Sequence, residues 1–91
     1  MQLSEYLKSM NQKFSGKCVR LYCAKDQYVE GIYLGIWRDG HLSYISYCHN
    51  KKTANICNLQ LEKVGMIQAL QEVAAEEKKL IYQYISSGTS I

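Results

Sequence analysis

The sequence has no long apolar run. Its longest stretch of this kind, Ile32 to Trp37, is far shorter than a membrane span, and residues 1–8 contain no apolar segment of signal-peptide length. These absences argue against secretion and membrane insertion, so we expect a cytoplasmic protein. An even number of cysteines leaves a disulfide framework open, but an intracellular chain favours free thiols at Cys18, Cys23, Cys48 and Cys57.

The sequence also lacks a strong charge of one sign. Its 11 basic and 8 acidic residues give a formal net charge of only +3, which by itself does not indicate nucleic-acid binding. The basic residues nevertheless gather in the first half, at Lys8, Lys13, Lys17, Arg20, Lys25, Arg38, Lys51 and Lys52.

Catalytic and metal-binding motifs are missing as well. There is no nucleophile elbow, no P-loop and no nucleotide-binding glycine pattern, and the cysteines are not arranged as Cys-x2-Cys pairs. Cys18 and Cys23 are five residues apart, so a regular strand would point them to opposite faces. We therefore expect no metal, no cofactor and no enzymatic activity. The alternative is a small cysteine-dependent enzyme that pairs Cys48 with His41 or His49.

What is present indicates one folded domain over residues 1–91. The hydrophobic content of 47% and the charged content of 21% are typical of globular proteins, and 91 residues give a thin core. Apolar residues three to four positions apart predict a helix over about 4–14, which Gly16 ends. The stripe consists of Leu3, Leu7, Met10 and Phe14.

Between residues 17 and 61 the apolar period changes to two, which predicts four or five short strands. Asp39-Gly40 is a strong hairpin signal between two of them. Residues 28–37 are apolar on both faces and contain two glycines, which favours a bent sheet. A long amphipathic helix is predicted over about 66–85, followed by a tail over 86–91.

The predicted class is α+β, an antiparallel meander with a short N-terminal and a long C-terminal helix. Short connections exclude parallel βαβ units. A small SH3-like barrel is preferred over an antiparallel sheet covered by helices.

Aromatic residues within the strands carry the functional prediction. Tyrosines interleaved with cations can stack bases and hold phosphates, but aromatic side chains also serve in protein interfaces, and we favour a protein partner. The candidate partner-binding residues are Tyr22, Tyr33, Trp37, Tyr44, Tyr47, Arg20, Arg38, Lys51 and Lys52.

The first half of the chain, residues 3–48, resembles the Sm-like RNA-binding proteins. The resemblance rests on the N-terminal helix, on the segment that begins at Lys17, on the Val29-Glu30-Gly31 step and on the apolar strand after it. It implies a small SH3-like barrel and single-stranded RNA as the alternative partner. The Asp and Asn with which that family contacts bases are replaced here by Trp37 and His41, so the RNA-reading pair is absent.

The predicted C-terminal helix is too long for its own sheet, because seven apolar positions would span about 27 Å at 1.5 Å per residue. We therefore expect a homo-oligomer, most simply a dimer, with Ile81, Tyr84 and Ile85 at its interface. The combined prediction is a self-associating, non-enzymatic binding module. A short, proline-free chain without catalytic motifs also suits an accessory or inhibitor protein of a phage, plasmid or virus.

Overall fold

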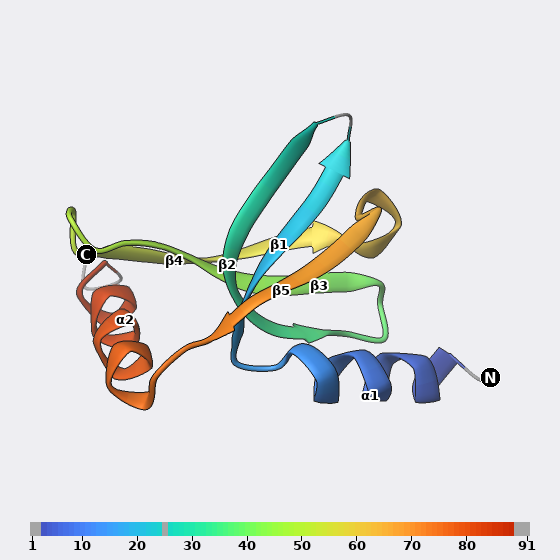
Figure 1. The fold of residues 1–91 in the computed structure, drawn as a ribbon, viewed down its shortest axis with the longest axis horizontal. Helices are drawn as coiled ribbons and strands as arrows, with labels where there is room; N and C mark the ends of the chain where they lie inside the picture. The colour runs from blue at the N-terminus through green and yellow to red at the C-terminus, as the bar shows by residue number, and fades with distance from the viewer. Residues whose placement is uncertain (1–2, 25, 89–91) are drawn as a thin grey trace.

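A computed structural model describes residues 3–24 and 26–88 (Figure 1). These residues form two helices, five strands and one 3-10 turn, and the four strand pairings among them are antiparallel. The α+β class, with an antiparallel sheet and a helix at each end, is thus confirmed. The elements are α1 (Leu3–Phe14), β1 (Lys17–Ala24), β2 (Gln27–Ile36), β3 (His41–Cys48), β4 (Thr53–Gln60), η1 (Leu61–Lys63), β5 (Met66–Glu72) and α2 (Ala75–Gly88).

The sheet is bent but open. Its strand order is β4-β3-β2-β1-β5, so β4 and β5 form two separate edges and do not pair with each other. Figure 1 shows the β1–β2 hairpin rising steeply from the plane of β3 and β4. The preferred prediction of a closed barrel is therefore wrong. To close the barrel, β5 would have to pair with β4, but β5 pairs only with β1.

Residues 66–72 form strand β5 and not the start of a long helix. They pair with β1 from Tyr22↔Met66 to Lys17↔Glu72, with a bulge on the way. Helix formers such as Gln71 and Glu72 are drawn into a strand because β1 otherwise leaves its backbone groups unpaired. Helix α2 begins only at Ala75 and extends to Gly88, so the tail predicted from residue 86 begins too early; residues 89–91 lie outside the described range.

Two apolar clusters lie on opposite faces of the sheet. Helix α1 covers the first cluster, and α2 packs against β4 and covers the second. Strand β2 contributes to both, which agrees with its apolar residues on both faces. The first cluster contains Leu7, Phe14, Val19, Leu21, Tyr33, Ile36, Leu42 and Tyr44, and the second contains Ile32, Ile45, Ala54, Val73, Ile81 and Tyr84.

The predicted turn signals are confirmed. Gly16 ends α1 with φ of 77°, and Gly40 has φ of 88° in the turn between β2 and β3. Such positive φ angles are strained for side chains other than glycine. No helix within the described residues is long and apolar enough to cross a membrane.

Candidate functional site

Two of the predicted partner-binding tyrosines lie in the core. Tyr33 is fully buried and Tyr44 is 6% exposed, both in the cluster beneath α1. Burial raises the pKa of each phenol to about 12. These two side chains pack the fold and are not available to a partner, so their assignment to a binding face is wrong.

The other predicted residues do not share one face either. Arg20 and Tyr22 lie on β1, whereas Trp37 and Arg38 follow the end of β2. Tyr47 is on β3 near the β3–β4 turn, which carries Lys51 and Lys52. A single aromatic strand face does not form, because strands alternate between two covered faces and the sheet bends between its ends.

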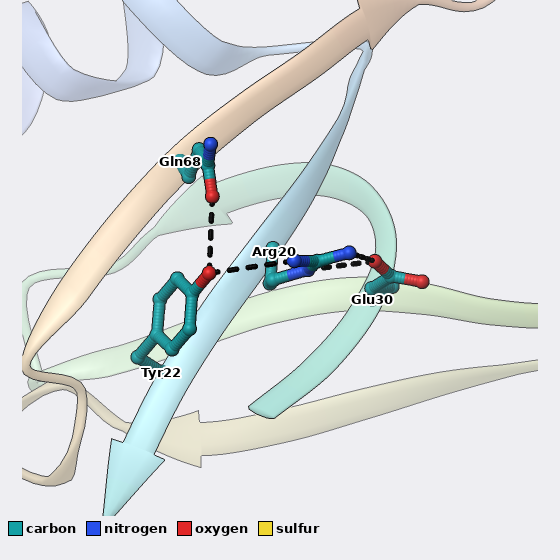
Figure 2. A network of polar contacts seen from close by, with 4 residues as sticks. All are labelled: Arg20, Tyr22, Glu30 and Gln68. Atoms are coloured by element: carbon teal, nitrogen blue, oxygen red, sulfur yellow. Dashed lines mark hydrogen bonds and ion pairs between the residues drawn. The ribbon is translucent and has the colours of Figure 1, made fainter. Parts of the chain in front are cut away.

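Arg20 and Tyr22 belong to a polar network that is satisfied within the chain (Figure 2). The guanidinium of Arg20 contacts Glu30 at 2.6 and 2.8 Å and the hydroxyl of Tyr22 at 3.4 Å, and it lies 4.3 Å from the ring centre of Tyr28. Tyr22 in turn donates to Gln68 Oε1 at 3.1 Å. Because each of its three guanidinium nitrogens already has a partner and its plane contacts a ring, Arg20 is poorly placed to hold a phosphate.

Trp37 is exposed and yet held in place. The residue is 56% exposed, and its indole Nε1 donates to Ser43 Oγ at 2.9 Å. Ser43 is buried and donates to Asn58 Oδ1 at 2.6 Å. The backbone of Trp37 is also fixed, since its N–H donates to His41 O at 2.8 Å. The chain therefore presents a large aromatic surface to solvent in one orientation.

A groove of about 800 Å³ separates Trp37 from α1. One wall is the helix and the other is the end of β2 with the start of the following turn. We call this the Trp37 groove. It is lined by Glu5, Leu7, Lys8, Asn11, Gln12, Ser15, Ile36, Trp37 and Arg38.

Asn11 fixes the helix wall of the groove to the sheet. Its Oδ1 accepts hydrogen bonds from the Tyr33 hydroxyl at 2.7 Å and from Ile36 N–H at 2.8 Å, and its Nδ2 donates to Ile36 O at 3.3 Å. Sequence reasoning missed this residue. A signal was present, because Asn11 falls between Leu7 and Phe14 on the apolar stripe of α1, where a polar side chain needs a partner.

Both histidines, one of which a cysteine-dependent enzyme would pair with Cys48, contact acidic side chains. His41 Nδ1 lies 2.8 Å from Asp39 Oδ2, and this hydrogen bond lowers the pKa of the carboxyl. His49 contacts Glu77 at 2.9 Å and the Tyr84 hydroxyl at 3.2 Å, which ties the β3–β4 turn to α2.

The thiols lie in ordinary structural surroundings. Burial raises the pKa of the Cys18 thiol. The four cysteines are free and partly buried. Over residues 3–24 and 26–88, no three His, Cys, Asp or Glu side chains are grouped closely enough to hold a metal ion.

The predicted dimer interface is part of the monomer core. Ile81 is fully buried and Tyr84 is 8% exposed, both packed in the cluster with Ile32 and Ile45, and Ile85 is partly buried against it. The prediction that these side chains extend beyond their own domain is wrong. Helix α2 starts nine residues later than predicted, so the shorter helix fits over the sheet.

Comparison with protein-family models, with characterised proteins and with solved structures finds no match. The resemblance to Sm-like proteins therefore stays a prediction.

Proposed function

We propose that the chain is a non-enzymatic binding module that holds a protein partner in the Trp37 groove and associates with copies of itself. The observation that carries the first part is Trp37, an exposed ring held by hydrogen bonds beside a groove whose two walls are tied together. Tryptophan is enriched among residues that dominate binding energy, and a side chain fixed before binding loses little entropy on association.

The charges of the groove favour a protein over RNA. Glu5 lines it together with Lys8 and Arg38, so cations and a carboxylate face the same space. Nucleic-acid sites need a positive surface that follows the phosphates, and a carboxylate repels them. Mixed charges beside an aromatic anchor are instead typical of the rim of a protein interface.

Single-stranded RNA remains the alternative, and the fluorescence of Trp37 tests it directly. The chain contains one tryptophan, so its emission reports on the groove alone. When a short single-stranded RNA is added at low salt, we expect no change in emission maximum or anisotropy. A change that weakens steeply as salt rises would reveal phosphate binding and support the RNA alternative. Repeating the titration with Arg38→Gln would then show whether the groove is the RNA site.

The thiol and histidine environments support a role without catalysis. A nucleophilic cysteine needs a lowered pKa and a base within hydrogen-bond reach. The pKa of the Cys18 thiol is shifted upward. Both ring nitrogens of His49 contact side chains of α2, Tyr84 and Glu77, so neither nitrogen is left to act as a base for Cys48.

The two edges of the sheet, β4 and β5, pair with no further strand among the described residues, and this supports self-association. Strand β4 contains no charged residue and β5 contains one, Glu72 at its end. Ile56 on β4 is 56% exposed, and Met66 and Leu70 on β5 are 55% and 40% exposed. Natural sheets protect free edges with lysine, proline or a covering element, because unpaired strands pair with other chains. We infer that copies associate through these edges.

Sedimentation tests this association. The wild type should sediment above its 10.5 kDa monomer mass, and Ile56→Lys should sediment as a monomer. A wild type that is monomeric at micromolar concentration would disprove association through the edges.

A further inference from the structure

The hydrogen bonds behind Trp37 form an ordered series across three segments of the chain. Trp37 follows β2, Ser43 lies on β3 and Asn58 lies on β4, where Ser43 and Asn58 face each other in the register. The indole nitrogen donates to Ser43 at 2.9 Å, and the serine hydroxyl donates to Asn58 at 2.6 Å. The series begins at the exposed ring and ends on the edge strand of the sheet.

The chemistry of the three groups gives this series a fixed direction. An indole N–H can only donate, a serine hydroxyl can accept and donate at once, and the amide oxygen of asparagine accepts. Each hydrogen bond in such a series polarises the next, and Ser43 is buried where water competes little. The hydroxyl of Ser43 thus turns toward Asn58 and leaves a lone pair for Trp37.

Neither Ser43 nor Asn58 lines the Trp37 groove. A partner seated in the groove would touch the ring of Trp37, while these two residues act only through that ring. Their effect on binding would come from the orientation and mobility of the indole.

We propose that Ser43 and Asn58 are positioning residues that set the orientation of Trp37 for its partner, an inference that rests on the proposed function. Freeing the ring restores rotamers that binding must then restrict. Ordering one such side chain costs about 0.5–1.5 kcal/mol, so loss of the series should weaken partner binding roughly 2- to 10-fold. Removal of the ring itself should cost much more.

The positioning can be measured in the free protein with the emission of its single tryptophan. Ser43→Ala removes the central hydroxyl, and Asn58→Leu removes the terminal acceptor at an exposed position. In both variants we expect lower Trp37 anisotropy and stronger acrylamide quenching. Ser43→Thr keeps the hydroxyl, and Asn55→Leu makes the same change on β4 away from the series. Both controls should behave like the wild type.

Unchanged anisotropy and quenching in Asn58→Leu and Ser43→Ala would overturn the inference. A merely structural role would lower the melting temperature of these variants without loosening the ring, so each is measured well below its transition. Asn58→Leu keeps the test valid if the buried Ser43→Ala fails to fold. The free-protein measurement does not involve the partner, so failure of the proposed function would appear separately, as partner capture that persists in Trp37→Ala.

Discussion

Gly31→Ala is expected to destabilise the fold by about 3 kcal/mol, at the upper end of the range for overpacked sites. A methyl group at residue 31 would overlap the backbone carbonyl oxygen of Ile45 and stand 2.8 Å from Cδ2 of Tyr44. Backbone atoms cannot move aside as a flexible side chain does, so β2 and β3 would have to separate where the sheet bends. The melting temperature should fall by roughly 15 °C for a domain of this size.

Gly35→Ala is the matched control on the same strand. The nearest atoms to a methyl group at residue 35 belong to Asn11, at 3.6 to 4.0 Å, which is ordinary van der Waals contact. This variant should keep or slightly gain stability, because alanine restricts the unfolded chain more than glycine does. If both variants lost the same stability, the loss would come from the reduced flexibility of the strand. The close approach of the Ile45 backbone to residue 31 would then not be its cause.

Ile81→Ala is expected to destabilise the chain by about 4 kcal/mol, as large-to-small substitutions do in a packed core. Ile81 is fully buried in the cluster between α2 and the sheet, where it packs with Ile32 and Ile45. Leu80 is the neighbouring residue on the same helix and is 43% exposed. Leu80→Ala should therefore cost under about 1 kcal/mol, since alanine and leucine are both good helix formers.

Urea denaturation monitored by circular dichroism measures both variants. The comparison also decides whether α2 is a core helix or a dimer interface. If Ile81 were an interface residue, Ile81→Ala would reduce the sedimentation mass and leave monomer stability unchanged. That outcome would contradict the core position of Ile81.

The elements with a strong local signal were predictable from the sequence. The stripe of α1, the alternation of Val19 and Leu21 on β1, and the Asp39-Gly40 turn each depend on residues close together in the chain. Strand β5 was not predictable in this way. Its residues suit a helix equally well, and only the unpaired edge of β1, more than forty residues earlier, makes them a strand.

The candidate site was predictable only in part. Trp37 and Arg38 were named from the sequence, but Tyr33 and Tyr44 were placed on the same binding face and are buried. Alternation along a strand cannot tell which face is covered when a helix covers each face. The irregular pairing between Tyr33 and Gly35 also shifts Ile36 into the cluster beneath α1, which places Trp37 at the surface.

The sequence did not indicate which distant partners the polar residues of the site contact. The hydrogen bonds of Asn11 to Tyr33 and Ile36 cross 22 and 25 residues of sequence, and Ser43 and Asn58 are 15 residues apart. Polar residues of this kind are common in strands and helices. Only the bent sheet, which brings α1, β2, β3 and β4 together, distinguishes them.

Capture of the partner by wild type and by two alanine variants tests the central claim most directly. The immobilised proteins are incubated with extract of the source cells, with and without nuclease treatment. Trp37→Ala removes the proposed anchor, and Tyr28→Ala removes another exposed aromatic side chain, 49% exposed and outside the groove. Wild type and Tyr28→Ala should retain the same protein. Trp37→Ala should lose it, because anchors of this kind contribute about 2 kcal/mol or more. Equal retention by Trp37→Ala, or retention that disappears with nuclease treatment, would contradict the account.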